Sequence, residues 1–397
     1  MTAAESHLLP VYAPPEQVFV RGEGCWIWDD KGEKYLDCIA GIAVNALGHA
    51  APVLQKALTE QAGKLWHTSN MFKVKGQEEL AAKYTRDSFA DVVFFTNSGT
   101  EAIEGALKTA RKFHTANGNP DRIDIIGFEG SFHGRSYAAI NASGNPNYLE
   151  GFGPRLPGFK QAKFGDLESV KALVSDTTAA VIVEPVQGEG GVRAGSDELL
   201  RGLRKLADDN GFLLIFDEVQ SGAGRTGKMW AHEWAGIAPD IMAVAKGVGG
   251  GFPMGAFLAT KEAAKGMVRG VHGTTFGGNP LAMAVGNACY DELSKPEFLE
   301  RVNKMANHLG QALEGLKDRH PELVAETRGK GLLRGLKLKI DPKPIQAKLR
   351  ERRVLVGVAG DNVLRLAPPL IIDEAQVSQA IDAIDAVLAA QLTEAGA

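Results

Sequence analysis

Short apolar runs alternate with longer amphipathic stretches through the middle of the chain. Each run has the length of a buried strand, and apolar residues recur at helical spacing in the stretches between them. Continuously apolar strands separated by helices predict an α/β fold, with a mostly parallel sheet covered on both faces. The runs lie at residues 92–95, 123–126, 180–183, 212–216 and 241–244.

The pattern changes at both ends of this alternating region. Residues 1–49 read as an N-terminal arm followed by a β-hairpin at 25–36, which we expect to pack with the C-terminal part. From residue 281 onward, long helical patterns (281–319), short strands and a closing helix predict a smaller α+β domain. The expected division is therefore an arm at 1–49, a large domain at 50–280 and a small domain at 281–397.

Composition narrows the class of protein. The 397 residues carry 44 Lys and Arg against 48 Asp and Glu, a net charge of −4 that argues against nucleic-acid binding. The three cysteines, Cys25, Cys38 and Cys289, have no CxxC spacing, which excludes a disulfide framework and a cysteine zinc site. Neither a secretion signal nor an apolar run of membrane-spanning length is visible. We expect a cytoplasmic protein that binds no membrane and no metal.

Ligands of such sheets bind beyond the carboxyl ends of the strands, so the segments after the apolar runs are candidate sites. After the first run, Ser98, Gly99 and Thr100 precede a helix, where free backbone N–H groups suit a phosphate. Ordinary helix capping explains the same residues. After the second run, Phe132, His133 and Arg135 suit stacking on a planar ring and gripping a carboxylate, although this segment by itself favours a hydrophobic anchor beside a solvated arginine.

The fourth run leads directly into Asp217 and Glu218. A carboxylate at the end of a buried strand requires a cationic partner, either Mg²⁺ or a protonated heterocyclic nitrogen. The Mg²⁺ alternative, a nucleotide hydrolase, draws on the phosphate-loop-like segment 222–228. It fails because Met229 stands where a Ser or Thr hydroxyl must ligate the metal, and because this segment does not join an earlier strand to a helix.

The fifth run leads to Lys246, followed by glycines. A lysine desolvated at a strand end has a lowered pKa and becomes a nucleophilic amine, whereas an exposed loop lysine is the ordinary alternative. Only 29 residues separate Asp217 from Lys246, so one crossover brings both to the same sheet edge. Pyridoxal phosphate needs an anion cradle, a stacking aromatic ring, an acid opposite its ring nitrogen and a lysine for its aldehyde. One ligand thus accounts for all these segments.

The motifs in their order resemble the class III (omega-amino acid) aminotransferases over nearly the whole chain. They are Asn97–Ala102, Phe132–Arg135, Glu184–Glu189, Asp217–Gln220, Gly224–Gly227, Lys246-Gly247 and Thr274–Pro280. The resemblance implies a fold type I pyridoxal-phosphate transferase that works as a homodimer. It also implies N-acetylornithine as amine donor and 2-oxoglutarate as acceptor, giving N-acetylglutamate 5-semialdehyde and glutamate in arginine biosynthesis.

The resemblance further implies a role for each matching residue. Lys246 attaches the cofactor covalently, and Asp217 pairs with its pyridinium nitrogen. The substrate carboxylates fall to two arginines, Arg135 for the donor and Arg365 for glutamate, with Glu189 as the switchable partner of Arg365. The remaining contacts are Gly99 and Thr100 with the phosphate, Phe132 with the ring, Glu218, Val219 and Gln220 along the cofactor, Thr274 near the substrate, and Thr275 with phosphate across the dimer interface.

Two alternatives stay open besides the hydrolase. Another omega-aminotransferase, acting on ornithine, succinylornithine, succinyldiaminopimelate or 4-aminobutyrate, shares most of these motifs. The other alternative is a non-catalytic binding module, which predicts that Lys246→Ala changes no turnover. Thr274 and Ser221 depart from the residues common in the family, Ser and Cys respectively, without affecting the assignment to the class.

Overall fold

A seven-stranded sheet forms the centre of the larger lobe in the computed structural model, which describes residues 7–395. Its strand order is β4-β12-β11-β10-β7-β5-β6, and every pair is parallel except those of β12 with β4 and β11. The expected α/β fold with a mostly parallel sheet is confirmed. The strands are β4 (Val92–Thr96), β5 (Asp124–Phe128), β6 (Phe159–Ala162), β7 (Thr178–Val183), β10 (Leu213–Asp217), β11 (Ile241–Val244) and β12 (Gly255–Ala259).

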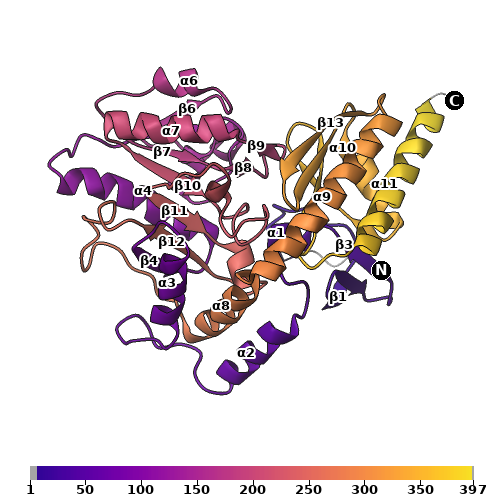
Figure 1. The fold of residues 1–397 in the computed structure, drawn as a ribbon, viewed down its shortest axis with the longest axis horizontal. Coiled ribbons are helices and arrows are strands. Elements are labelled where there is room, and N and C mark those ends of the chain that lie inside the picture. The colour runs from indigo at the N-terminus through magenta and orange to yellow at the C-terminus, as the bar shows by residue number, and fades with distance from the viewer. Residues whose placement is uncertain (1–6, 396–397) are drawn as a thin grey trace.

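Helices cover both faces of this sheet (Figure 1). On β7, Ala180 and Ile182 belong to the apolar cluster with helix α4 (Gly99–Ala116), whereas Val181 and Val183 belong to the cluster with α7 (Asp197–Asn210). This alternation is the reason that the strands read as continuous apolar runs. As its sequence predicts, α7 ends at Gly211, which adopts the left-handed conformation (φ +66°).

The second lobe contains an antiparallel sheet of β13 (Val324–Lys330), β14 (Leu333–Leu338), β17 (Val363–Leu366) and β16 (Gly357–Ala359). Helices α9 (Pro296–Arg319), α10 (Pro342–Glu351) and α11 (Glu374–Ala395) pack beside it (Figure 1). The long helical pattern at 281–319 divides into α8 (Pro280–Leu293) and α9, because Ser294 and Lys295 separate them and Pro296 starts a new helix.

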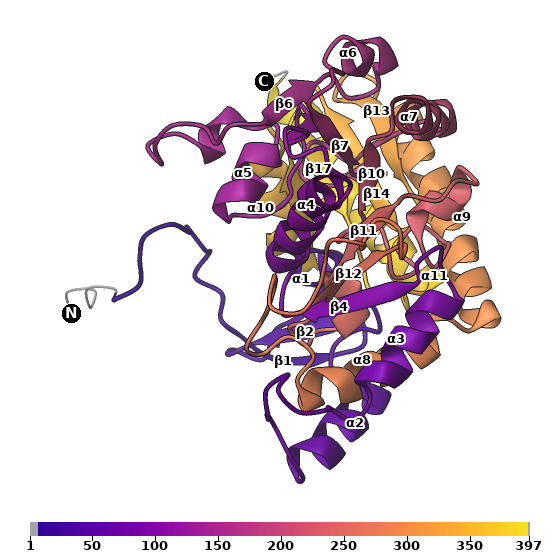
Figure 2. The same cartoon turned by 90° about the vertical axis from the view of Figure 1, so that its left-hand side faces the viewer.

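The N-terminal strands join this second lobe through a shared sheet. β1 (Phe19–Glu23), β2 (Trp26–Asp29) and β3 (Lys34–Asp37) form a meander whose last strand pairs in parallel with β15 (Val354–Leu355). The chain before β1 extends away from the body (Figure 2). Residues 1–6, on which part of the expectation of no secretion signal depends, lie outside the described residues.

Several short elements complete the fold. β6 and β12 were not among the expected strands, since β6 is partly polar and β12 begins in a glycine-rich stretch. The remaining elements are α1 (Ala40–Ala43), α2 (Pro52–Ala62), α3 (Gln77–Arg86), α5 (Tyr137–Ala142), α6 (Leu167–Lys171), β8 (Val186–Gln187), β9 (Arg193–Ala194) and the 3₁₀ turns η1 (Pro146–Tyr148), η2 (Ala231–Trp234) and η3 (Lys246–Gly249).

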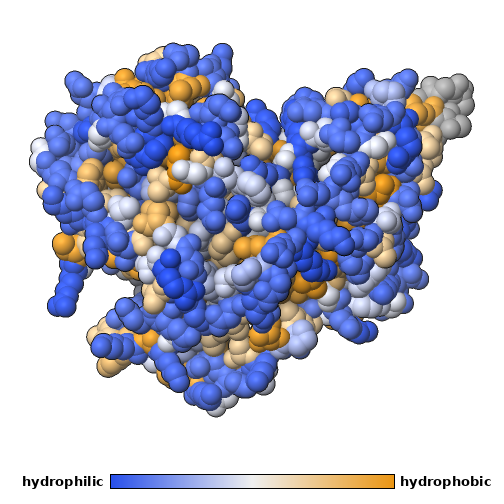
Figure 3. Space-filling view, in the orientation of Figure 1, coloured by the Kyte–Doolittle hydropathy of each residue, from blue (hydrophilic) through white to orange (hydrophobic). Residues whose placement is uncertain are grey.

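The surface on the side shown in Figure 3 is largely hydrophilic, with apolar residues in small scattered areas. Among residues 7–395, no helix is long and apolar enough to cross a membrane. The same residues contain no group of three or more His, Cys, Asp or Glu side chains placed to hold a metal ion.

Candidate active site

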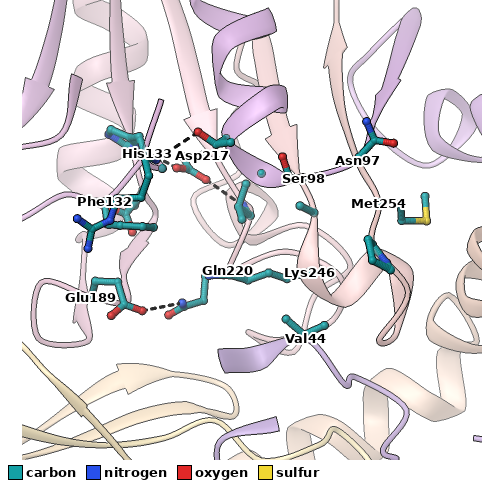
Figure 4. Close-up of a pocket in the computed structure, with 18 of the residues that line it drawn as sticks. Val44, Asn97, Ser98, Phe132, His133, Glu189, Asp217, Gln220, Lys246 and Met254 are labelled. Carbon is teal, nitrogen blue, oxygen red and sulfur yellow. Dashed lines mark hydrogen bonds and ion pairs between the residues drawn. The ribbon is translucent and has the colours of Figure 1, made fainter. Parts of the chain in front are cut away.

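A cavity of about 420 Å³ opens at the carboxyl edge of the large sheet (Figure 4). Segments that follow β4, β5, β7, β10 and β11 line it, although they are far apart along the chain. This is the edge where parallel α/β sheets bind their ligands. The predicted residues that line the cavity are Gly99, Thr100, Phe132, Arg135, Glu189, Asp217, Val219, Gln220 and Lys246.

Lys246 lies directly beyond β11, at the start of the η3 turn. Its backbone adopts the left-handed conformation (φ +48°), which a residue with a side chain rarely takes. Burial lowers the pKa of its ammonium group, while the nearby carboxylates of Glu189 and Asp217 oppose that shift. Part of the side chain faces the cavity, so the structure presents the amine as a partly desolvated nucleophile.

Asp217 ends the adjacent strand β10, whose register places it beside Ala243 of β11. Only 4% of Asp217 is exposed. One carboxylate oxygen accepts the Val219 backbone N–H (3.0 Å), and the other lies 2.7 Å from Nδ1 of the buried His133. These two contacts fix the orientation of the carboxylate at the cavity wall (Figure 4).

The sequence indicates an imidazole in the loop after β5 but does not predict the pairing of His133 with Asp217. The other ring nitrogen of His133, Nε2, is buried and has no hydrogen-bond partner among the described residues. Glu184, directly after β7, is a second cavity residue whose role the sequence does not predict. The strand-end rule that pointed to Asp217 would have found Glu184 as well.

Glu184 is a buried acid whose oxygens accept the backbone N–H groups of Phe132 (2.8 Å) and Gly188 (3.3 Å). Burial and the neighbouring Asp217 raise its pKa well above the ordinary value. The side chain thereby ties the loop after β5 to the loop after β7. It holds Phe132 in its place on the cavity wall.

The N-terminus of α4 also lines the cavity, close to the loop that follows Asp217. Ser98 caps the helix by accepting the Glu101 N–H, and the first-turn residues Gly99 and Thr100 line the cavity. A Cβ atom on Gly99 would lie 2.7 Å from Val219 Cγ1, so glycine permits this close approach of the two loops. The helix N-terminus supplies backbone N–H groups and positive potential to a bound anion.

Two arginines approach the site in different states. Arg365 of β17 is buried, and its guanidinium lies 2.5 Å from the carboxylate of Glu189. Although burial alone would raise the pKa of Glu189, Arg365 holds it below the ordinary value. Gln220 also contacts this carboxylate, at 3.4 Å (Figure 4).

Arg135, by contrast, forms no ion pair with a carboxylate in the described part of the chain. Its guanidinium stacks on the ring of Tyr148 (4.1 Å) and lies near that of Phe132 (5.6 Å). Cation–π contacts hold an arginine in place without neutralising its charge. The cavity wall therefore carries one free guanidinium, Arg135, whereas the guanidinium of Arg365 lies behind Glu189 and is masked by it.

Four predicted residues lie outside the cavity lining: Arg365, which reaches it only through Glu189, and Glu218, Thr274 and Thr275. Glu218 points away from it, and its carboxylate accepts the backbone N–H groups of Ala231 (2.5 Å) and His232 (2.8 Å). Thr274 closes a turn by accepting the Gly277 N–H, and Thr275 is exposed on the same loop. The structure thus brings the other predicted residues together in one chain, Arg365 among them through Glu189, but not Glu218, Thr274 and Thr275.

Residues 11–388 match the model of the family described as aminotransferase class-III. The chain belongs to this family. The class-III aminotransferases use pyridoxal phosphate, so the resemblance seen in the sequence, the cofactor and the transaminase class are confirmed.

Individual relatives are similar over their full length. The chain is 55% identical to the acetylornithine aminotransferase 2 of Caulobacter vibrioides, covering 100% of this chain and 98% of that protein. It is 52% identical to the acetylornithine aminotransferase of Rhodobacter capsulatus, covering 98% of each. Among solved structures, the ornithine aminotransferase of Toxoplasma gondii superposes with a TM-score of 0.94 at 31% identity, covering 98% of this chain and 94% of that one.

The residues that line the cavity of this class-III aminotransferase fit pyridoxal phosphate, independently of the family match. The α4 N-terminus suits the phosphate, and Gly99 leaves room where a Cβ atom would close the gap to Val219. The donor set includes an amine with a lowered pKa and, on the neighbouring strand, a carboxylate oriented by His133. The residues present therefore match the phosphate, the ring nitrogen and the aldehyde of this cofactor.

Proposed function

We propose that the enzyme transfers the terminal amine of N-acetylornithine to 2-oxoglutarate, producing N-acetylglutamate 5-semialdehyde and glutamate. The observation that carries this proposal is the pair of arginines, one free and one masked by Glu189. The donor reacts at its terminal carbon and glutamate at its α-carbon, so the two substrates need different anchors for their α-carboxylates. The anchor for glutamate, Arg365, must be masked while the donor binds. The full-length identity to the acetylornithine aminotransferases of Caulobacter and Rhodobacter supports the same donor and a role in arginine biosynthesis.

The proposal assigns the cofactor contacts as follows. Lys246 would hold the aldehyde carbon through its amine, Asp217 would face the ring nitrogen, and Gly99 and Thr100, which line the same cavity, would receive the phosphate. Phe132, Val219 and Gln220 border the ring, and the buried Glu218 shapes their loop from behind. Bound pyridoxal phosphate supplies an electron sink for the bond that breaks at the substrate carbon.

Four side chains of the protein account for proton transfer and for binding of the substrate carboxylates. Asp217 keeps a proton on the ring nitrogen, because a carboxylate at this position stabilises the positive charge. With the cofactor bound, the amine of Lys246 would be the base that takes a proton from the amine-bearing carbon of the donor and the acid that gives it back. Arg135 binds the donor α-carboxylate, with Thr274 nearby, so that the terminal amine reaches Lys246. In the second half-reaction, Arg365 binds the α-carboxylate of glutamate or 2-oxoglutarate.

A donor panel tests this assignment. We expect the specificity constant for N-acetylornithine to exceed those for ornithine, N-succinylornithine, N-succinyl-diaminopimelate and 4-aminobutyrate, each measured with 2-oxoglutarate as acceptor. A higher constant for any of the other four reassigns the donor within the class. Absence of transamination with all five contradicts the proposal.

The Glu189 gate gives a sharper prediction. Replacing Glu189 with Gln removes the charge that masks Arg365, so we expect the rate constant over dissociation constant for glutamate to rise about fivefold relative to that for N-acetylornithine. Single-turnover absorbance of each half-reaction measures the ratio. Glu326→Gln, which removes a surface ion pair with Arg328 in the small sheet, is the control. Equal changes in both half-reactions contradict the gate.

We also propose that two copies assemble, with Thr275 reaching the phosphate of the partner's site. Exposed apolar side chains support an interface beside that loop: the ring of His67 contacts Phe276, next to Thr275. Further exposed apolar residues in the segment before α3 are Leu65, Trp66, Met71 and Phe72. Sedimentation equilibrium should give twice the chain mass, and a monomer with full activity would refute the shared site.

The domain division at about residues 49 and 280 and a cytoplasmic location remain proposals as well. The pairing of β3 with β15 supports grouping the N-terminal strands with the small domain, as expected from the sequence. Limited proteolysis should then cut near residues 49 and 280 before it cuts inside either unit. Cell fractionation that finds the enzyme outside the cytoplasm would contradict the location.

A further inference from the structure

Arg225 is a fully buried cation for which the proposed mechanism has no use. Only 2% of the residue is exposed, and no carboxylate pairs with it among the described residues. Burial lowers the pKa of its guanidinium to about 9. A charge without a counter-ion destabilises a protein interior unless its hydrogen bonds compensate, so its contacts indicate what it does.

Those contacts cross from one lobe to the other. Nη1 donates to the backbone oxygens of Pro368 (2.5 Å) and Leu332 (3.1 Å), and the Arg225 carbonyl accepts the Leu332 N–H (2.9 Å). The backbone passes so closely here that a Cβ atom on Gly331, which has a φ of +63°, would lie 2.4 Å from the Arg225 oxygen. Glycine at 331 therefore permits the contact.

Both acceptors flank the strand pair that carries Arg365. Leu332 directly precedes β14, and Pro368 follows β17 by two residues. Arg365 lies on β17 opposite Gly335 of β14. Arg225 thus binds the two strands at the same end of their ladder. Its acceptor Pro368 lies three residues after Arg365, the arginine that holds Glu189.

The loop that presents Arg225 is anchored in the large lobe. It begins at Asp217 and Glu218, and the buried Glu218 carboxylate binds the backbone of Ala231 and His232 at its far end. Within the loop, Arg225 N–H donates to the Gly222 oxygen, and Gly222 N–H donates to the Glu218 oxygen. A rigid chain of contacts therefore connects the carboxylate at the cofactor edge with the strand that carries Arg365.

We infer that Arg225 is a positioning residue for the glutamate half-reaction: it fixes Arg365 at its distance from the cofactor edge. The inference rests on the proposed function, because it takes Arg365 as the anchor for the glutamate carboxylate. Arg135, the proposed donor anchor, stands on the loop after β5 and is held by Phe132 and Tyr148. Disturbing Arg225 therefore affects one half-reaction and spares the other.

The test compares two arginine replacements of the same kind. Arg225→Met removes the link between the lobes and keeps much of the side-chain volume. Arg334→Met is the matched control, since among the described residues Arg334 also donates to backbone oxygens only, those of Gly329, Gly331 and Ala306 within the small lobe. For each holoenzyme, the thermal midpoint and the single-turnover kinetics with glutamate and with N-acetylornithine are measured separately.

We expect Arg225→Met to lower the rate constant over dissociation constant for glutamate about tenfold or more, mainly by weakening binding, and to change that for N-acetylornithine less than twofold. Arg334→Met should lower the thermal midpoint without changing the ratio of the two. If Arg225→Met does not fold, Arg225→Lys, which keeps one cationic donor, takes its place. It should also lower the constant for glutamate more than that for N-acetylornithine, but by a smaller factor. Equal losses in both half-reactions in whichever variant folds overturn the inference. A wild-type enzyme that does not react with glutamate overturns instead the proposed function.

Discussion

Lys246→Ala should reduce transamination by about 10⁴-fold or more, because one amine both attaches the cofactor and transfers the proton. The geometry behind this expectation is the position of Lys246 beyond β11, with a lowered pKa and in a cavity shared with Asp217. Steady-state rates with N-acetylornithine and 2-oxoglutarate measure the loss. Far-ultraviolet circular dichroism should remain that of the wild type.

Lys261→Ala provides the control for Lys246→Ala. Lys261 follows the neighbouring strand β12 but is exposed, with its backbone N–H bound to Asp91. We expect this variant to keep wild-type activity. Turnover by Lys246→Ala within tenfold of the wild type would contradict the role of Lys246.

Asp217→Asn should lower both half-reactions about 10³-fold while the protein stays folded. Asparagine has nearly the same shape and can still contact His133 and Val219, but its neutral amide does not stabilise a proton on the ring nitrogen. Stopped-flow absorbance with each substrate measures the effect. Loss in one half-reaction alone would disagree with a role at the ring nitrogen, which both half-reactions share.

Asp240→Asn separates this effect from the simple loss of a carboxylate. Asp240 precedes β11 at the opposite end of the sheet, where it pairs with Arg204 (2.8 Å) and accepts the Leu214 N–H. Its replacement should cost stability, seen as a lower thermal midpoint, without an effect on either half-reaction. A similar loss of rate in both variants would show that the effect of Asp217→Asn is general.

The sequence predicts the large lobe well because its strands are buried on both faces. The apolar runs at 212–216 and 241–244 correspond to β10 and β11, whose parallel pairing brings Asp217 and Lys246 to one edge. Gly211 ends α7 as expected, since a residue without a side chain adopts the left-handed φ of +66° without strain. Local chemistry and hydrophobic pattern agree at these positions.

Other features depend on contacts that no local pattern contains. β6 has the sequence FKQA, and its place at the sheet edge comes from pairing with β5. The contact between His133 and Asp217 joins the loop after β5 to the end of β10, two strands that β7 separates. Likewise, the burial of Arg225 follows from the approach of two lobes, whereas the sequence places it in a glycine-rich turn.

The central claim is that Lys246 carries the pyridoxal phosphate of this aminotransferase. Borohydride reduction of the holoenzyme, followed by proteolysis and peptide mass analysis, tests it directly. We predict one reduced cofactor adduct per chain, on the peptide that contains Lys246, and none after prior conversion of the enzyme with N-acetylornithine. An adduct on a different lysine, or a reduced protein without any adduct, would contradict the account.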